Sequence, residues 1–108
     1  MKFITKKDIK LPVRRKDSHK GDNGLVLAVG GSKDFVGAIA LTGLAALRSG
    51  ADLVKIIAPE KVAWAINAYS LDLMTLKMKG NFVDSDYFEI IKKEIERYDV
   101  LLIGNGIG

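Results

Sequence analysis

The amino-acid sequence predicts an α/β fold, with a mainly parallel sheet between two layers of helices. Three apolar runs, at residues 25–29, 53–58 and 99–103, have the length and continuity of strands that are buried on both faces. Segments with a helical spacing of apolar residues separate these runs. Because parallel strands are joined by right-handed crossovers, this alternation indicates one sheet with helices on both faces.

The first strand and the first helix have clear boundaries in the sequence. Residues 25–29 form a continuous apolar run that is closed by Gly30 and Gly31. A helix is expected at residues 37–49, and Gly50 supplies its stop, because glycine tolerates the left-handed conformation of a C-cap. The predicted packing side of this helix comprises Ala38, Leu41, Leu44, Ala45 and Leu47.

The middle of the chain predicts a second strand, a second helix and a weaker third run. Residues 53–58 are rich in β-branched side chains and end at Pro59. A helix is expected at residues 60–69, and residues 73–78 form a less regular run that fits a short strand. The apolar residues at helical spacing in the second helix are Val62, Ile66 and Tyr69.

The last helix has the clearest amphipathic pattern of the chain. Asp84, Ser85 and Asp86 offer N-cap side chains ahead of it. One face of the helix is apolar and the other is mostly charged. The apolar face comprises Phe88, Ile91, Ile95 and Tyr98, and the charged face comprises Glu89, Lys93, Glu96 and Arg97. The strand at residues 99–103 follows.

We expect two regions: a basic N-terminal leader and loop, residues 1–24, and a truncated α/β domain, residues 25–108. The first twenty residues contain eight lysines and arginines, although the net charge of the whole chain is only +4. Such an arm is compatible with nucleic-acid binding, but no aromatic stacking pattern accompanies it, so a solvated leader is the favoured interpretation. Three principal strands leave exposed sheet edges. We therefore expect a missing C-terminal part, or another copy of the chain, to complete the sheet.

Residue types exclude several classes of site. The chain has no cysteine and one histidine, His19, which excludes disulfides, thiolate metal sites and histidine-rich metal sites. No Walker A run, Ser/His/Asp triad or paired carboxylate site is present. Trp64 and Tyr69 are expected to pack rather than to stack on a nucleotide base. No signal peptide or apolar run of membrane-spanning length occurs, so a cytoplasmic protein without membrane or nucleic-acid partners is expected.

Two glycine-rich loops follow predicted parallel strands. The first is Gly30-Gly31-Ser32, ahead of Gly37 and Ala38 at the start of a helix, and the second is Gly104-x-Gly106-x-Gly108. Ligands of open parallel sheets bind beyond the carboxyl ends of the strands, where small residues let them approach backbone N–H groups and a helix N-terminus. The first loop departs from the standard phosphate-binding motifs, and the second lacks the position that is needed to compare it with them. For either loop alone, a structural turn and a binding site are therefore equal alternatives.

The order of these motifs resembles that of the ADP- or ATP-dependent NAD(P)H-hydrate dehydratases, which are similar to ribokinase in fold. The resemblance rests on His-Lys-Gly-Asp-Asn-Gly at residues 19–24, on the two glycine loops, on residues 45–54 and on residues 69–74. It extends from about residue 18 to the last residue. Asn105 stands where the family usually has proline, and asparagine also suits a turn.

The resemblance implies the repair of damaged nicotinamide nucleotides. The substrate of such enzymes is the S-epimer of NADHX or NADPHX, the hydrated coenzymes. ADP or ATP, with Mg²⁺, phosphorylates the hydroxyl of the hydrate, and phosphate is then eliminated. By position in the family, the expected substrate-binding residues are Ala38, Gly104, Gly106 and Gly108. Further candidates for a substrate loop are His19, Lys20, Gly31, Ser32 and Gly37.

The catalytic part of the family pattern is missing from this sequence. Its Gly-Thr-Gly-Asp motif, which carries the catalytic base, does not occur in the 108 residues, and neither does the loop that receives the adenine nucleotide. We therefore expect no catalytic residue and no metal ligand in this chain, and no dehydratase activity from the chain alone. The alternative is a non-catalytic nucleotide-binding or assembly module of Rossmann-like type.

Overall fold

The computed structural model describes all residues, 1–108, and contains one four-stranded sheet in which every strand is parallel. The elements, after a short 3₁₀ turn at Lys6–Asp8, are β1 (Leu25–Val29), α1 (Gly37–Arg48), β2 (Leu53–Pro59), α2 (Glu60–Tyr69), β3 (Met74–Met78), α3 (Tyr87–Ile95) and β4 (Val100–Ile103). The predicted α/β fold and all of its predicted elements are therefore confirmed, including the weak strand that became β3.

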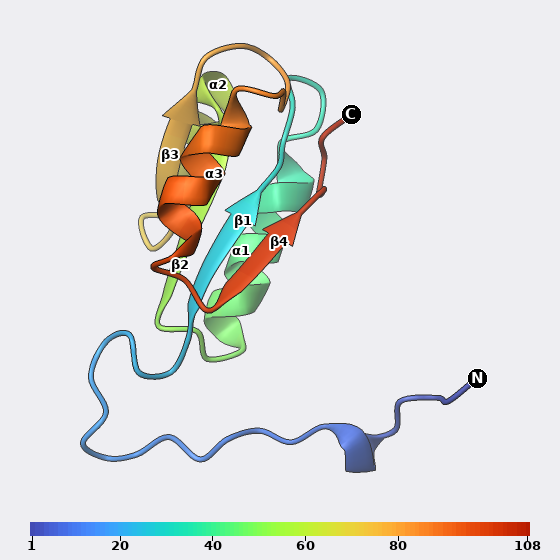
Figure 1. The fold of residues 1–108 in the computed structure, drawn as a ribbon, viewed down its shortest axis with the longest axis vertical. Coiled ribbons are helices and arrows are strands. Elements are labelled where there is room, and N and C mark those ends of the chain that lie inside the picture. The colour runs from blue at the N-terminus through green and yellow to red at the C-terminus, as the bar shows by residue number, and fades with distance from the viewer.

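The order of the strands across the sheet is β3-β2-β1-β4. The chain moves outward from β1 through β2 to β3, and it then returns over the sheet through α3 to place β4 on the other side of β1 (Figure 1). Val29, the last residue of β1, lies opposite Ile57 of β2 and Ile103 of β4. The segments that follow β1 and β4 therefore leave the same edge of the sheet side by side.

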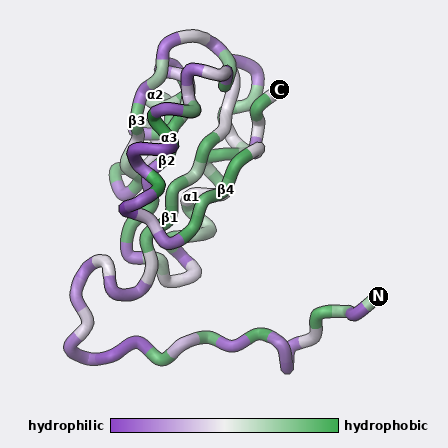
Figure 2. The backbone as a smooth tube through the Cα atoms, in the orientation of Figure 1, coloured by the Kyte–Doolittle hydropathy of each residue, from purple (hydrophilic) through white to green (hydrophobic).

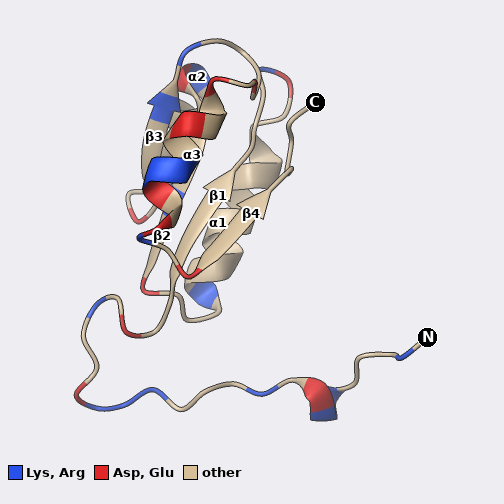
Figure 3. Cartoon of the chain, in the orientation of Figure 1, with Lys and Arg blue, Asp and Glu red and all other residues tan.

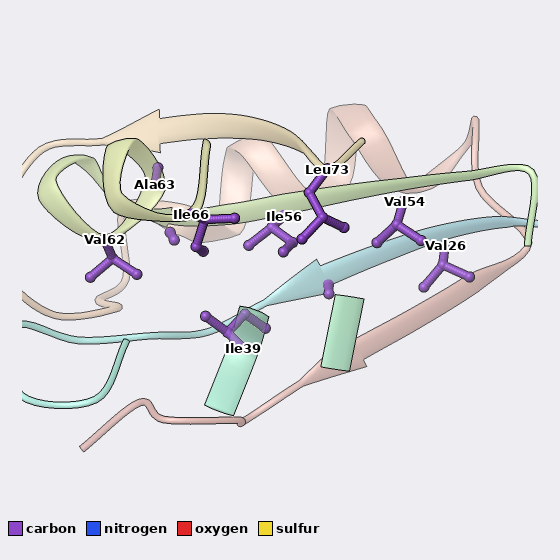
Figure 4. Close-up of a cluster of buried hydrophobic side chains, with 10 residues drawn as sticks. Val26, Ile39, Val54, Ile56, Val62, Ala63, Ile66 and Leu73 are labelled. Carbon is purple, nitrogen blue, oxygen red and sulfur yellow. The ribbon is translucent and has the colours of Figure 1, made fainter. Parts of the chain in front are cut away.

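Helices cover the two faces of the sheet unequally. On one face, α1 and α2 enclose ten buried residues, which include Val54, Ile56 and Ile66 (Figure 4). On the other face, α3 covers a smaller cluster of four buried residues, Leu27, Val29, Ile57 and Tyr87. Burial raises the pKa of Tyr87 to about 12, so this phenol is neutral at physiological pH. No helix of this fold combines the length and the hydropathy that crossing a membrane requires.

The buried stripe of α1 differs from the predicted one. Ile39 and Gly43 are the fully buried residues, whereas Ala38, Leu41 and Ala45 are exposed. Gly43 is needed at this point because a Cβ there would lie 2.9 Å from the side chains of Ile56 and Leu73. The prediction was right for Leu44 and Leu47, which pack against the core, and wrong for the three exposed residues. It missed Gly43 because it counted apolar side chains only.

Three other sequence expectations are wrong or hold only in part. Ile91 and Tyr98 of the apolar face predicted for the last helix pack against the smaller core cluster, as expected. Phe88 is 62% exposed and Ile95 is 38% exposed, whereas Tyr87 is the buried residue of α3. Trp64 and Tyr69 of α2 are mostly exposed, so neither packs into the core. The N-cap residue of α3, Asp86, makes no side-chain capping bond. Instead, the carboxylate of Asp84 accepts the Asp86 N–H at 2.9 Å.

Residues 1–24 run beside the sheet rather than over it (Figures 1 and 2). Their apolar side chains are exposed, among them Phe3, Leu11 and Val13. Figure 3 shows lysines and arginines spread along this segment among fewer acidic residues, and both signs of charge over the rest of the chain. Arg14, Gly21 and Asn23 join the segment to the rest of the chain through the carboxylate of Asp52, which is described below.

Candidate functional site

The two glycine loops meet at the carboxyl edge of the sheet. The Gly31 N–H donates a hydrogen bond of 2.8 Å to the carbonyl oxygen of Asn105, which joins the loop after β1 to the loop after β4. The Gly30 N–H bonds to Ile57 O, and the Gly104 N–H bonds to Val29 O, each at 3.2 Å. These bonds extend the sheet beyond its last regular residues, and they make the two loops one surface.

At three glycines of this edge, neighbouring protein atoms occupy the space that a side chain would need. A Cβ at Gly30 would overlap the carbonyl oxygen of Asn105. A Cβ at Gly31 would lie 2.8 Å from Val62, and one at Gly106 would lie 2.9 Å from the carbonyl oxygen of Phe35. Gly31 and Gly106 also have positive φ angles, which other residues rarely adopt. Gly30 and Gly106 let the two loops pack backbone against backbone, and Gly31 leaves room for the side chain of Val62 from α2, so all three have a structural role.

Other small residues at the same edge are open to a ligand. No heavy atom would lie within 4 Å of a Cβ at Gly37 or Gly104. Ala38, the second residue of α1, is exposed. Gly108 is intermediate, because a Cβ there would be in ordinary contact with the ring of Phe82 at 3.5 Å. The small residues that leave space for a ligand are therefore Gly37, Ala38 and Gly104.

The N-terminus of α1 is the main electrostatic feature of this edge. Its N-cap, Val36, provides no side-chain acceptor, and the first turn contains no acidic residue. The N–H groups of the first turn therefore have no side-chain cap, and they lie at the positive end of the helix dipole. Such a terminus binds anions, phosphate above all.

The Ser32 side chain is the unusual polar group of the site. Its hydroxyl is fully buried and has no hydrogen-bond partner. Lys33 and Phe82 lie beside it: the Lys33 N–H bonds to Asn81 O at 2.9 Å, and the Lys33 ammonium lies 5.7 Å from the centre of the Phe82 ring. Sequence reasoning missed Lys33 and Phe82, because nothing local to the sequence shows that the loop before α3 reaches this edge.

His19 and Lys20 do not lie with the other candidate residues. They precede β1, and they are therefore at the amino edge of the sheet, opposite the glycine loops (Figure 1). The His19 N–H donates to the carboxylate of Asp22 at 2.7 Å. His19 also lines a hollow of about 1060 Å³ between residues 11–24 and the C-terminal end of α1. The structure thus separates the predicted site residues into two groups.

Asp52 holds the loop that follows His19 and Lys20 against the rest of the fold. Its carboxylate accepts the Gly21 N–H at 2.8 Å and the Asn23 N–H at 2.9 Å, and it pairs with Arg14 at 3.2 Å. The hydrogen bond from the Asn23 N–H is the main reason that the pKa of Asp52 lies below its ordinary value of 3.8. Sequence reasoning quoted Asp52 within the 45–54 run but gave it no role.

The hollows of the surface do not coincide with the carboxyl-edge residues. An apolar groove of about 380 Å³ lies between α1 and α2, and it includes Gly37, Leu41 and Tyr69. Neither this groove nor the hollow beside His19 contains Ala38 or any residue of the Gly104–Gly108 loop. The carboxyl edge is thus an open surface in this chain. No group of three or more His, Cys, Asp or Glu side chains could hold a metal ion.

A sequence profile described as "NAD(P)H-hydrate dehydratase" matches residues 26–108. Among curated relatives, the bifunctional NAD(P)H-hydrate repair enzyme Nnr of Methanothermobacter thermautotrophicus is 41% identical over 100 residues, which are 93% of this chain and 19% of the relative. The ADP-dependent (S)-NAD(P)H-hydrate dehydratase of Staphylococcus aureus is 34% identical over 104 residues, which are 96% of this chain and 35% of the relative. The chain thus spans about a fifth to a third of these relatives.

Solved structures agree with the fold and with the region that is matched. A ribokinase-like superfamily protein from Enterococcus faecalis superposes with a TM-score of 0.75 at 28% identity, over 91% of this chain and 32% of its own. The ADP/ATP-dependent NAD(P)H-hydrate dehydratase from Bacillus subtilis, co-crystallised with ATP/Mg²⁺, gives a TM-score of 0.58 at 37% identity, over 62% of this chain and 24% of its own. The four-stranded sheet therefore corresponds to part of a ribokinase-like fold.

Proposed function

This chain belongs to the NAD(P)H-hydrate dehydratase family, and we propose that it forms part of the substrate site of an enzyme that repairs hydrated NADH and NADPH. The substrate is the S-epimer of NADHX or NADPHX, and the product is the intact coenzyme. Two relatives support this choice of substrate. One is a bifunctional NAD(P)H-hydrate repair enzyme, and the other is an ADP-dependent (S)-NAD(P)H-hydrate dehydratase. The cytoplasmic location stays a prediction.

The observation that carries the proposal is the joined pair of glycine loops beside the N-terminus of α1. The bond from Gly31 to Asn105 sets the spacing of the two loops, and it lets the loops after β1 and β4 act as one surface. A dinucleotide carries two or three phosphates, which suit the uncapped N–H groups at the start of α1. In open parallel sheets, this edge is the usual place for a nucleotide.

We assign the candidate residues two different roles. Gly37, Ala38 and Gly104 are open, and we propose that they form the surface against which the substrate lies. Gly31 and Gly106 hold the loops together, and Gly108 lies at the rim beside Phe82. We propose that the loop of His19 and Lys20 organises the N-terminal segment and does not touch the substrate, because the structure places this loop at the opposite edge.

The chemical steps need groups that this chain does not provide. Phosphorylation of the hydrate and loss of phosphate require a base, an anion-stabilising loop and a nucleotide site. The carboxyl edge of this chain offers small residues and backbone N–H groups instead. No group of three or more His, Cys, Asp or Glu side chains offers a ready-made metal site, and Mg²⁺ with a nucleotide is usually held by one or two carboxylates together with the phosphates. We propose that ADP or ATP and Mg²⁺ act with the substrate on residues beyond this chain.

A second candidate function, an assembly module, is favoured by the edge strand β4. Its residues Val100, Leu102 and Ile103 are between 37% and 55% exposed, and it pairs only with β1. An unpaired apolar edge invites a further strand. We propose that β4 is covered in the active enzyme, either by a further part of the ribokinase-like domain or by another copy of the chain.

Binding of the hydrated coenzyme tests the proposed function. We expect the chain to bind NADPH hydrate in isothermal titration calorimetry, and to give no NADPH from the hydrate when ADP and Mg²⁺ are added. The variant Ala38→Leu should bind about tenfold more weakly or worse, because its side chain would fill the open surface. The matched control is Ala45→Leu, which lies on the same helix and is also exposed. No binding by the unaltered chain, or equal binding by all three proteins, would refute the proposal.

A further inference from the structure

The Ser32 hydroxyl is a buried polar group whose surroundings leave it without a partner. The main chain of this residue is satisfied, because the Ser32 N–H bonds to Phe35 O at 3.2 Å and the Phe35 N–H bonds to Ser32 O at 3.1 Å. Only the side chain is unpaired. Leaving a hydroxyl without a hydrogen bond in the interior is unfavourable, and each such group in a folded protein calls for an explanation.

A structural explanation does not account for serine at this position. Alanine would fit the same space and would remove the unpaired hydroxyl, so serine adds nothing to the packing of the free chain. The other buried hydroxyl without a partner, that of Tyr87, differs in this respect. Tyr87 fills the small core beneath α3 with its ring, so burial of the ring outweighs the unpaired oxygen.

The position of the hydroxyl points to the seam between the two glycine loops. Its oxygen lies 3.6 Å from the place that a Cβ of Gly108 would occupy, so Gly108 lies beside it. Gly108 is exposed, whereas Gly106 of the same loop is packed against the carbonyl oxygen of Phe35. Gly108 is thus the residue that would have to move for a ligand to reach the hydroxyl.

The groups around the contact between the two glycine loops indicate the charge of the ligand that would bind there. Lys33, the next residue, supplies a cation above the Phe82 ring at the rim. The N-terminus of α1 begins five residues after Ser32, and its first turn is uncapped by any side chain. A hydroxyl donor, an ammonium group and a helix N-terminus all favour an anion, and a phosphate oxygen accepts hydrogen bonds from each of them.

We propose that Ser32 is a substrate-binding residue whose hydroxyl donates a hydrogen bond to a phosphate oxygen of the hydrated dinucleotide. The phosphate reaches the hydroxyl when Gly108 moves aside. This inference rests on the proposed function, and it extends that function by assigning a specific donor to the phosphate. It also explains why a buried hydroxyl is kept at a cost in stability: its partner arrives with the substrate.

The variant Ser32→Ala tests the proposal through two readouts that move in opposite directions. Binding of NADPH hydrate, measured by calorimetry, should weaken about tenfold or more, which corresponds to the loss of a hydrogen bond to a charged group. The midpoint of thermal unfolding without ligand should be unchanged or higher, because an unpaired buried hydroxyl is removed. The matched control is Ser49→Ala, whose hydroxyl bonds to Ala45 O at the far end of α1. This control should bind the hydrate as the unaltered chain does.

The outcomes separate this inference from the function on which it rests. If the unaltered chain binds the hydrate and Ser32→Ala binds it equally well, the inference is wrong and the proposed function stands. If Ser32→Ala unfolds at a clearly lower temperature, the hydroxyl has a structural partner and the inference is also wrong. A parallel titration with ADP distinguishes the phosphates of the substrate from those of the nucleotide. Weakening with ADP alone would overturn the assignment to the substrate, and no binding of the hydrate by the unaltered chain would refute both proposals.

Discussion

The two edges of the sheet hold loops of the same apparent kind in the sequence, yet they are built differently. At the carboxyl edge, Gly30 and Asn105 meet through backbone atoms, and the N-terminus of α1 is left uncapped. At the amino edge, the carboxylate of Asp52 gathers the N–H groups of Gly21 and Asn23. The carboxyl edge keeps donors free, whereas the amino edge uses its donors within the protein. We propose that the first arrangement is the one that receives the ligand.

The largest effect is expected from closing the contact between the glycine loops. Gly30→Ala places a methyl group onto the carbonyl oxygen of Asn105, which must move and carry the β4 loop with it. We expect a loss of about 1 to 3 kcal/mol in the free energy of unfolding, in the range of other overpacked positions. Urea denaturation measures it.

Gly37→Ala is the matched control for that substitution. It is the same change at the same edge, but no atom lies within 4 Å of the added methyl group. Alanine is favoured over glycine in a helix, so Gly37→Ala should be neutral or more stable by up to about 1 kcal/mol. If the two variants lost equal stability, the distinction between packed and open glycines at this edge would be wrong.

A smaller and more local effect is expected at the amino edge. Asp52→Ala removes the acceptor for the Gly21 and Asn23 amides and the partner of Arg14. The amides of residues 21 and 23 should exchange with deuterium faster, while those of β1 remain protected. Asp99→Ala, which removes the acceptor of the Leu25 N–H, serves as a comparison at the same edge. Unchanged exchange at residues 21 and 23 in Asp52→Ala would contradict the role of this carboxylate.

The contact of the Asp52 carboxylate with the Gly21 and Asn23 amides should also depend on pH. The pKa of Asp52 is lowered in the folded chain, so its ionised form is favoured by folding, and the contribution is present above the ordinary value of 3.8. It is lost as the pH falls through the lower, folded value. We therefore expect the amides of residues 21 and 23 to stay protected from deuterium exchange near neutral pH. They should lose that protection only below about pH 4. Opening that begins near neutral pH would contradict this role of Asp52.

The smallest effect is expected at His19. Its backbone N–H bonds to Asp22, a contact that His19→Ala keeps, and the residue lies at the amino edge. We expect binding of NADPH hydrate to change less than about twofold, a difference within a few tenths of a kcal/mol. A tenfold loss in calorimetry would place His19 in the substrate site and would join the two edges functionally.

Much of the fold could be predicted because the strands carry their own signal. Continuous apolar runs located β1, β2 and β4 almost to the residue, and Gly50 marked the end of α1 with a φ of +110°. Burial was harder to predict, because it depends on the neighbours. The buried face of α1 includes Gly43, and Tyr87 rather than Phe88 is the buried residue of α3. The helical spacing of apolar residues in the sequence does not distinguish these faces from the predicted ones.

The candidate site could be predicted only in part. The meeting of the two glycine loops follows from the parallel order of their strands, and it was expected. The division of the glycines into packed and open ones depends on distances between segments that are some 75 residues apart in the sequence, such as Gly30 and Asn105. The separation of His19 from the Gly31 loop, by contrast, could have been predicted, because His19 precedes β1 and Gly31 follows it, so the two lie at opposite ends of that strand.

The most direct test of the central claim, that the carboxyl edge receives the substrate, is a titration of the ¹⁵N-labelled chain with NADPH hydrate, followed by amide chemical shifts. We expect the amides of Gly37, Ala38 and Gly104 to shift and saturate, and those of Gly21 and Asn23 to stay in place. Shifts confined to residues 19–24, with an unchanged carboxyl edge, would contradict the claim.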